Sequence, residues 1–237
     1  MRPAPPWRVL PNGPLEKLED NLWEVEGSVP GMPLNRRMTL VRLQDGSIVV
    51  HNAICLKEEE QLEIERWGKV RYIIVPSGFH RMDAPRYAAR YPDAKVLCPD
   101  PARKGASKVV RVDGNLSEIP SDPGLTVETL EGESIQEAVL IARSGGGRTS
   151  LVFNDSLMNL PRYPGFKGWL YQAMGSTGAP KVTPLMKVYA VKSKAALKAH
   201  LERLAALPGL VRAIPGHGAV VEGETTADVM RSVAAGV

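Results

Sequence analysis

The sequence predicts a mixed α/β fold, and three observations support that prediction. Residues 70–98 alternate between apolar strand patterns and helix-prone stretches, which is typical of βα units. Paired strand patterns separated by short turn sequences lie on both sides of this stretch. Hydrophobic residues make up 43% of the 237 residues and charged residues 24%, so the chain can bury a sizeable core without disulfide or metal support.

The amino-terminal part is predicted to be an arm followed by strands. Residues 1–20 contain several prolines, which disfavour regular hydrogen-bonded structure, and are predicted to be an extended arm. Residues 21–237 are predicted to form a single domain, which begins with an alternating strand pattern over 21–26. Residues 38–43 and 47–51 flank an Asp-Gly dipeptide, which is typical of a hairpin turn.

Two helices are predicted in the middle of the chain. The acidic stretch 56–67 is helix-prone and ends before Gly68, a plausible stop. A second helix begins at Asp83 and ends near residue 91. Asp83 is a candidate N-cap because its carboxylate can accept amide hydrogen bonds, and Pro85 suits the first turn.

The carboxyl-terminal half returns to hairpins and helices. The glycine run 145–147 is predicted to be a hairpin turn. Residues 156–186 combine prolines and glycines with aromatic residues and are predicted to be irregular, in the manner of a lid. The remaining strands are predicted at 70–75, 95–98, 125–130, 137–143, 149–153 and 211–214, and the remaining helices at 193–207 and 226–235.

The formal net charge is +4, and its distribution is uneven. No acidic residue lies within 156–201, so the rest of the chain carries all 26 acidic residues and is net negative. A solvated face is the favoured explanation, and attraction of an anionic small-molecule substrate or, less favoured, contact with a membrane surface is the alternative. No nucleic-acid partner is expected, because no RNA-binding motif is present. The basic residues of this segment are Arg162, Lys167, Lys181, Lys187, Lys192, Lys194 and Lys198.

Missing motifs exclude several function classes. No apolar run approaches the ~20 residues needed to span a bilayer, and residues 1–13 lack the apolar core of a secretory signal. Cys55 and Cys98 cannot form a disulfide framework or a four-cysteine zinc site and are expected to be inert buried thiols. There is no nucleophile elbow, Walker loop, dinucleotide fingerprint or CxxC pair. A cytoplasmic location is therefore expected.

Potential metal ligands follow three of the predicted strands. His80 and Asp83 follow strand 70–75, Asp155 follows strand 149–153, and His217 follows strand 211–214. Ligands are commonly collected at the carboxyl ends of strands, where loops converge. Histidine and aspartate are ligands of zinc, iron and manganese.

Each of these residues also has a purely structural interpretation. Asp83 can simply be the N-cap of its helix, and Asp155 can be a turn residue after a strand. His80 and His217 can be ordinary loop residues. His51 ends a predicted strand, where it is either a satisfied buried histidine or a contributor to a substrate pocket.

The order of these motifs resembles the metallo-β-lactamase superfamily over about residues 21–221. The most specific pieces are LVFNDSL at 151–157, which looks like the family's bridging-aspartate strand, and IPGHG at 214–218, which looks like its last-histidine loop. The resemblance implies a four-layer αββα sandwich with two mixed sheets face to face. Residues 22–25, 37–43 and 70–76 are similar to an uncharacterised, divergent branch, the DUF4336-type proteins.

The metal loop departs from the family pattern His-x-His-x-Asp-His. Asp83 takes the aspartate place, but phenylalanine, arginine and alanine stand at the three histidine places, and His80 is one position out of register. The family's separate middle histidine has no counterpart, because no histidine lies between His80 and His200. A full dinuclear site of the family uses about five histidines. This chain has four, and His200, within a predicted helix, is interpreted as structural.

The resemblance therefore implies a degenerate site with at most one metal ion. Its predicted ligands are Asp155, His217, Asp83 and His80, and the expected ion is zinc, iron or manganese, or none. The first hypothesis is a single-metal-dependent hydrolase of an anionic ester or phosphoester. The substrate pocket would then be lined by His51, Tyr163 and Trp169, with Phe166 in the same apolar wall. The alternative is a non-catalytic ligand-binding protein on the same fold that has lost its metals, in which Asp155 and His217 pair by hydrogen bonding.

Overall fold

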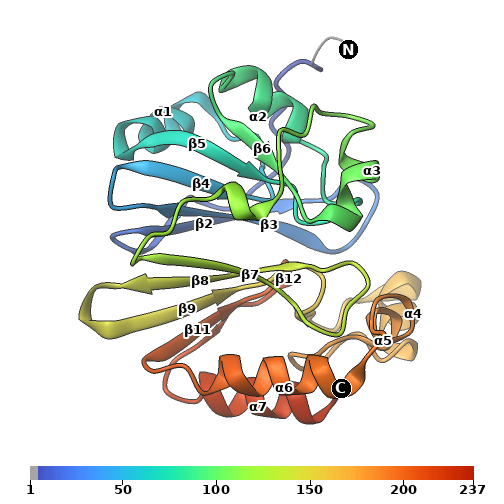
Figure 1. The fold of residues 1–237 in the computed structure, drawn as a ribbon. Helices are drawn as coiled ribbons and strands as arrows, with labels where there is room; N and C mark the ends of the chain where they lie inside the picture. The colour runs from blue at the N-terminus through green and yellow to red at the C-terminus, as the bar shows by residue number, and fades with distance from the viewer. Residues whose placement is uncertain (1–4) are drawn as a thin grey trace. The chain divides into compact units, whose positions relative to one another are not determined.

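The structure is a computed structural model that describes residues 5–237 and contains two compact units. The first unit comprises the residues up to Ser28 together with Arg37–Val127, and the second comprises Val29–Arg36 and Glu128–Val237. Each unit has a main β-sheet and helices of its own (Figure 1). The predicted mixed α/β fold is therefore confirmed. The single domain predicted over 21–237 stays a prediction.

The sheet of the first unit has six strands in the order β1-β2-β3-β4-β5-β6. The β3–β4 pair is an antiparallel hairpin with Gly46 at φ 81° in its turn, as the Asp-Gly dipeptide predicts. β5 is parallel to both β4 and β6, so the loops after these strands leave one edge of the sheet. The strands are β1 (Glu16–Glu19), β2 (Leu22–Ser28), β3 (Asn35–Arg42), β4 (Ser47–His51), β5 (Lys69–Ile74) and β6 (Lys95–Leu97).

The arm predicted over residues 1–20 is shorter in the structure. Residues 1–4 lie outside the described part of the chain. Glu16–Glu19 is strand β1, because it lies beyond the last proline of the arm and pairs antiparallel with β2. Before β1 the arm packs on the first unit. The Trp7 indole Nε1 donates to the Leu56 carbonyl at 2.9 Å, and its ring lies 5.3 Å from that of Tyr87.

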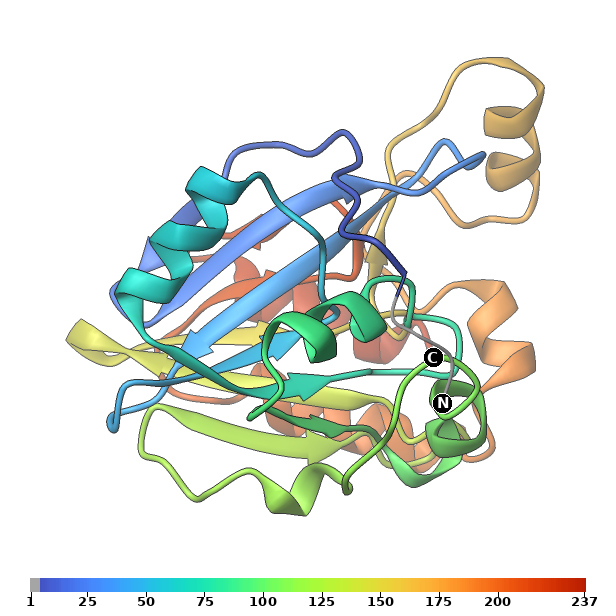
Figure 2. The same cartoon turned by 90° about the horizontal axis from the view of Figure 1, so that it is seen from above.

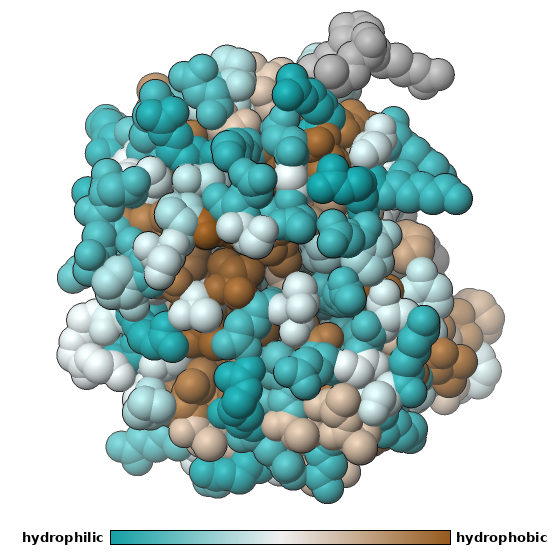
Figure 3. All heavy atoms as spheres, viewed as in Figure 1, coloured by the Kyte–Doolittle hydropathy of each residue, from teal (hydrophilic) through white to brown (hydrophobic). Residues whose placement is uncertain are grey.

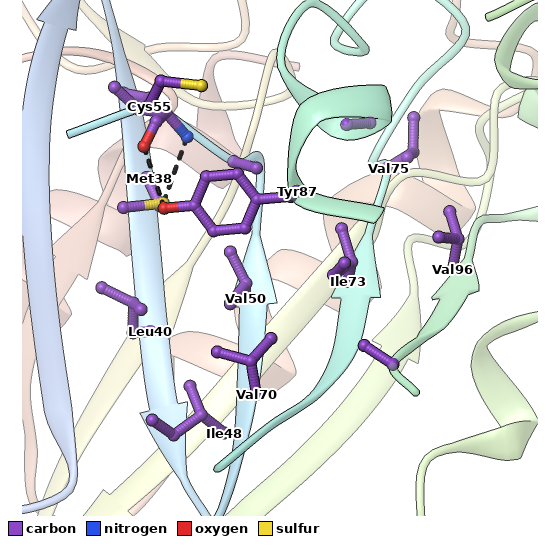
Figure 4. Close-up of a cluster of buried hydrophobic side chains, with 14 of the residues drawn as sticks. Met38, Leu40, Ile48, Val50, Cys55, Val70, Ile73, Val75, Tyr87 and Val96 are labelled. Carbon is purple, nitrogen blue, oxygen red and sulfur yellow. Dashed lines mark hydrogen bonds between the residues drawn. The ribbon is translucent and has the colours of Figure 1, made fainter. Parts of the chain in front are cut away.

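One face of the first sheet carries the core of this unit. Tyr87 projects from α2 (Ala84–Arg90) into this core, and its hydroxyl lies 2.9 Å from the Ile54 carbonyl oxygen and 3.3 Å from Met38 Sδ (Figure 4). Such hydrogen bonds allow a phenol to be fully buried without leaving its oxygen unsatisfied. The other helical segments of this unit are α1 (Glu58–Trp67), α3 (Arg103–Ala106), η1 (Asp100–Ala102) and η2 (Leu116–Glu118). The core includes Met38, Leu40, Ile48, Val50, Val70, Ile73, Val75 and Val96.

The main sheet of the second unit has the order β13-β11-β9-β8-β7. β8 and β9 form an antiparallel hairpin around the glycine turn η3 (Gly145–Gly147), and β9 and β11 run parallel. A separate parallel pair joins β10 to β12. The strands are β7 (Leu125–Thr129), β8 (Ala138–Ser144), β9 (Arg148–Val152), β10 (Met158–Asn159), β11 (Leu210–Ile214), β12 (His217–Gly218) and β13 (Val221–Glu222).

Helices α6 (Lys194–Ala205) and α7 (Thr226–Ala235) lie along this sheet (Figure 1). Both helices match their predicted positions. The Ser193 hydroxyl accepts the Ala196 amide hydrogen at 3.3 Å and so caps α6. Leu197, Leu201 and Met230 pack in a core with apolar residues of β8, β9 and β11.

The prediction that residues 156–186 are irregular is wrong in part. They contain β10, helix α4 (Gly165–Ala173) and the start of α5 (Pro184–Tyr189). The prolines that suggested irregular structure instead begin helices, since Pro164 is the N-cap of α4 and Pro184 is in the first turn of α5. Among the described residues, no helix is long and apolar enough to cross a membrane.

Candidate metal centre

Asp155 and His217 lie side by side in the second unit. In the parallel pair β9–β11, Val152 lies beside Ile214, so the loops after both strands leave the same edge of the sheet. Asp155 lies in the first loop and His217 begins β12 after the second. The distance from His217 Nε2 to Asp155 Oδ1 is 3.2 Å, and both side chains are largely buried. The structure thus brings together two of the four predicted ligands.

The glycines on both sides of His217 are required by close backbone contacts. Gly216 donates its amide hydrogen to the Asn154 carbonyl at 3.0 Å, and a Cβ at position 216 would lie 2.7 Å from that oxygen. Gly218 has φ 88°, and a Cβ there would lie 2.0 Å from the Asn159 carbonyl oxygen. The Gly-His-Gly sequence therefore holds the histidine loop directly against the aspartate loop.

The hydrogen bond at His217 Nδ1 limits the protonation states of Nε2, the ring nitrogen that faces Asp155. His217 Nδ1 is hydrogen-bonded to the carbonyl oxygen of Asn35, in the part of β3 that belongs to the second unit. A carbonyl can only accept, so Nδ1 carries the hydrogen. Nε2 then either carries a second proton, which gives an imidazolium–carboxylate pair, or directs its lone pair toward Asp155 Oδ1. The second arrangement needs a proton on the carboxyl group or a cation between the two acceptors.

Glu137, which immediately precedes β8, is hydrogen-bonded to the loop that carries Asp155. Its carboxylate is fully buried and accepts the amide hydrogens of Asn154 and Asp155, each at 2.7 Å, and that of Ser156 at 3.1 Å. These three bonds fix the backbone around Asp155. Burial, and then the neighbouring charges of Glu133 and Asp155, raise the pKa of Glu137 above its ordinary value.

Glu133 is a second buried carboxyl group close to Asp155. Burial is the main reason that its pKa rises to about 7, and the Asp155 charge adds to the effect. The Ser156 hydroxyl and the Glu137 amide are potential hydrogen-bond donors to the carboxylate, and they lower the pKa of Glu133 in part. Neither carboxylate oxygen, however, has a partner in normal hydrogen-bonding geometry among the described residues. A buried acceptor without such a partner beside Asp155 is stabilised either by a proton of its own or by a nearby cation.

In the first unit, Asp83 is engaged in structural contacts. It is buried, its Oδ2 accepts the Cys55 amide hydrogen at 3.2 Å, and its Oδ1 pairs with Arg86 at 3.0 Å. Asp83 stands at the N-cap position of α2, but its side chain makes no capping hydrogen bond. Its role as a metal ligand stays a prediction, and these contacts occupy both of its oxygens.

His80 and His51 lie near one another in the first unit. His80 follows β5 in a loop, where its amide donates to the Ser77 hydroxyl at 3.3 Å. His51 ends β4 and is only 1% exposed, with Nε2 lacking a partner among the described residues. Burial, and then the charge of His80, lower the pKa of His51 to about 3, so it is neutral at physiological pH. The placement of His80 beside Asp155, and of His51 in a substrate pocket, stay predictions.

The two aromatic residues predicted to line a pocket lie around α4. The Tyr163 ring is half-buried and lies 6.2 Å from that of Tyr171. Trp169 is 60% exposed and stacks on Phe166 with ring centroids 5.8 Å apart. Trp169 therefore presents its ring to solvent on the surface of the second unit.

Several solved structures have a fold similar to that of this chain over nearly its whole length. DIM-1 metallo-β-lactamase exposed to ceftazidime matches with a TM-score of 0.62 over 97% of this chain and 99% of that chain, at 13% identity. The metallo-β-lactamase from Hirschia baltica gives 0.58 over 96% and 98%, at 13% identity. FIM-1 from Pseudomonas aeruginosa, in its mono-zinc form, gives 0.59 over 96% of each chain, at 11% identity.

The fold is that of the metallo-β-lactamases. The likeness extends over nearly the whole chain, which confirms the fold that the two motifs around Asp155 and His217 imply. At these identities the likeness concerns the fold alone. No protein-family model matches the sequence. No curated protein matches it either.

On this metallo-β-lactamase fold, the sequence-based search missed Glu133 and Glu137. The available signal was their position, since the acidic stretch 131–137 leads directly into the apolar run of β8. A glutamate at the edge of a buried strand must be either paired or exposed. The candidate ligands were histidines and aspartates at the carboxyl ends of strands, whereas Glu133 and Glu137 precede a strand.

Three predictions of structural roles are confirmed. His200 is buried in α6, where its Nδ1 accepts the Glu131 amide hydrogen at 3.2 Å and its Nε2 lies 3.2 Å from Glu128. Cys55 and Cys98 are buried free thiols. Burial raises the pKa of both, that of Cys55 to about 12, which makes them unreactive.

Proposed function

We propose that this chain is a metal-dependent hydrolase-like protein with a single-metal site that includes Asp155 and His217. The observation that carries the proposal is the convergence of His217 Nε2 and Asp155 Oδ1 at 3.2 Å, with His217 Nδ1 committed to a backbone carbonyl. A backbone acceptor on the far nitrogen is how proteins commonly orient a histidine ligand. In this proposal His80 supplies a third ligand, and the site is a degenerate remnant of the family's two-metal centre, as in a divergent branch of the superfamily.

The chain's own residues have defined roles in this proposal. Glu137 fixes the Asp155 loop through three backbone hydrogen bonds. Asp83 positions the loop before α2 through Cys55 and Arg86, contacts that engage both of its carboxylate oxygens. When ionised, Glu133 adds negative charge beside Asp155, and a bound divalent ion such as zinc, iron or manganese would favour that ionised form. A bound ion supplies a Lewis acid that lowers the pKa of a bound water.

The proposed substrate is an anionic ester or phosphoester. Residues 156–201 contain seven basic residues and no acidic ones, so this side of the second unit attracts anions. Asp155 immediately precedes this segment in the sequence. His217 lies beside it, because Met158 of β10, the first strand of the segment, pairs with His217 of β12. The mono-zinc form of FIM-1 shows that another chain of this fold holds one zinc ion.

The second candidate is a non-catalytic ligand-binding protein. One observation favours it, because 3.2 Å between His217 Nε2 and Asp155 Oδ1 is also the length of a hydrogen bond. With both ring nitrogens protonated, an imidazolium–carboxylate pair explains the same geometry without a metal ion.

Metal analysis of untagged protein separates the two candidates. The metal proposal expects about one zinc, iron or manganese per chain, lost in Asp155→Asn and His217→Gln and greatly reduced in His80→Gln. Asp228→Asn is the matched control, since Asp228 is exposed and its removal leaves the site intact. Metal-free protein that takes up none of the three ions after dialysis would contradict the proposal.

The protonation state of His217 gives an independent reading. Nitrogen NMR of metal-treated protein should show a neutral ring with hydrogen on Nδ1 and a large shift at Nε2. The non-catalytic candidate expects hydrogen on both nitrogens, with no change on adding metal. Asp155→Asn should remove the imidazolium in the second case, because the ion pair that stabilises it is lost.

A further inference from the structure

We propose that α4 and α5 of the second unit dock on the surface of an anionic lipid membrane. This surface, the α4–α5 face, consists of the exposed apolar residues of the two helices and Met174 after α4. They are Phe166, Trp169, Leu170, Met174, Leu185, Val188 and Tyr189. Phe166 is 77% exposed and Val188 88%, which is unusual for large apolar side chains on one short stretch of chain.

The apolar residues of α4 lie on one stripe. Phe166, Trp169 and Leu170 have the i, i+3, i+4 spacing that places side chains on a single helical face. Figure 2 shows α4, in tan, at the margin of its unit and joined by extended segments, and Figure 3 shows brown side chains over α4 and α5 at the right-hand edge. The stripe is therefore turned outward instead of into the core of the second unit.

Charge selects an anionic partner for this face. The surrounding segment 156–201 has no acidic residue. Of its bases, the Lys181 ammonium donates to the Gly175 and Thr177 carbonyls, and that of Lys187 donates to Gly236. These two lysines hold the fold together. Among the bases whose side chains the structure describes, the exposed ones are Arg162, Lys192, Lys194 and Lys198, and Lys198 lies 3.9 Å from Glu202.

The combination of exposed aromatic and aliphatic residues with basic ones is typical of segments that lie in a membrane interface. Tryptophan prefers the headgroup level, where an amphipathic ring contacts both lipid and water. Lysine and arginine near the surface are attracted to anionic headgroups. α4 has nine residues, so it can lie in the interface but not cross the bilayer.

A second copy of the chain fits this face less well. In a two-fold symmetric dimer the same patch meets itself, so the bases of one α4–α5 face would lie against those of the other. The segment 156–201 itself contains no acidic residue to offset that repulsion. The inference does not depend on the proposed metal site, because none of the proposed ligands contributes to this face.

Vesicle binding of the full chain tests the inference. Sedimentation with vesicles of phosphatidylcholine and phosphatidylglycerol at 7:3 should capture the protein, and vesicles of phosphatidylcholine alone should not. Capture should fall as salt rises, because the electrostatic part is screened. Trp169 fluorescence should shift to the blue on binding, and Trp169→Phe should abolish the shift, since the other three tryptophans, Trp7, Trp23 and Trp67, belong to the first unit.

Two pairs of matched variants test the residues. Lys192→Glu with Lys194→Glu should weaken binding about 30-fold or more. Each lysine lost should cost roughly fivefold in affinity, and the added carboxylates increase the loss. Lys104→Glu with Lys108→Glu makes the same change in net charge among exposed residues of the first unit and should have little effect. Phe166→Ser with Trp169→Ser should abolish binding, whereas Met32→Ser with Leu62→Ser, also exposed, should not.

Three outcomes would overturn the inference. Equal loss in both charge-reversal variants would show a net-charge effect without a defined face. Equal capture by neutral vesicles would remove the anionic partner. A concentration-dependent dimer in analytical ultracentrifugation that disappears in Phe166→Ser with Trp169→Ser would assign the face to a second copy.

Discussion

At the scale of single residues, Glu137 links the interior of the second unit to the candidate centre. Its two carboxylate oxygens accept three amide hydrogens from consecutive residues of the Asp155 loop. Such an arrangement resembles a backbone nest around an anion, with the anion supplied by the protein itself. The position of Asp155 therefore depends on a residue that neither binds a ligand nor reaches the surface.

Replacing Glu137 by glutamine should destabilise the protein and weaken metal binding together. Glutamine has one acceptor oxygen, and its amide group would face the N–H groups that now meet the second oxygen. We expect a loss of about 2 kcal/mol in the free energy of unfolding and about 10–100-fold in metal affinity. Urea denaturation and metal titration measure the two effects.

The control for this change is Glu131→Gln. Glu131 lies in the same acidic stretch but its side chain is 72% exposed, so both quantities should stay near those of the unchanged protein. If Glu137→Gln matched this control, the three backbone bonds would have no role in holding the loop.

At the scale of elements, the apolar periodicity of the sequence predicts the strands and long helices well. α7 has the predicted bounds, and Ser193 caps α6 as expected. The short elements α4 and α5 were missed, because proline and glycine are counted as breakers although proline also begins helices. The buried glutamates were missed because burial of a charge depends on tertiary contacts that a local pattern does not contain.

The β10–β12 pair gives a prediction about glycine. Gly216→Ala would place a Cβ 2.7 Å from the Asn154 carbonyl oxygen, and Gly218→Ala would place one 2.0 Å from that of Asn159. We expect each to cost at least about 2 kcal/mol in the free energy of unfolding, since backbone must move and position 218 has positive φ. Gly145→Ala is the control, because a Cβ there meets nothing within 4 Å.

Thermal unfolding of the three alanine variants checks this order. Both loop variants should also weaken metal binding, because they separate the His217 loop from the Asp155 loop. A Gly216→Ala protein as stable as Gly145→Ala would mean that the two loops are not held in the contact described for them.

At the scale of the whole molecule, fold and chemistry differ in how far the sequence predicts them. The motifs around Asp155 and His217 imply the metallo-β-lactamase fold, and the solved structures confirm it over nearly the whole chain. The chemistry depends on whether a few polar atoms meet, and the spacing of His80 in the sequence does not determine that. The architecture is more predictable because it rests on many apolar contacts, whereas a metal site rests on a few polar side chains brought together by the tertiary structure.

Two buried titratable groups should give the protein opposing dependences of stability on pH. His51 has its pKa lowered from 6.5 to about 3, so its contribution is complete above pH 6.5 and is lost as the pH falls toward 3. Glu133 has its pKa raised from 4.5 to about 7, so its contribution is complete below pH 4.5 and is lost as the pH rises toward 7. Between pH 4.5 and 6.5 the two slopes, each about 1.4 kcal/mol per pH unit, offset one another.

Single substitutions should separate these slopes, measured as the free energy of unfolding against pH with a chelator present. Relative to the unchanged protein, Glu133→Gln should gain up to about 3 kcal/mol as the pH rises from 4.5 to 7. His51→Gln should gain in the opposite direction, as the pH falls below 6.5. Glu131→Gln should run parallel to the unchanged protein throughout.

Because a bound divalent ion stabilises the charged form of a nearby carboxylate, leaving out the chelator and adding metal should flatten the Glu133 slope alone. Parallel curves for all three variants would show that neither group is buried as the fold requires.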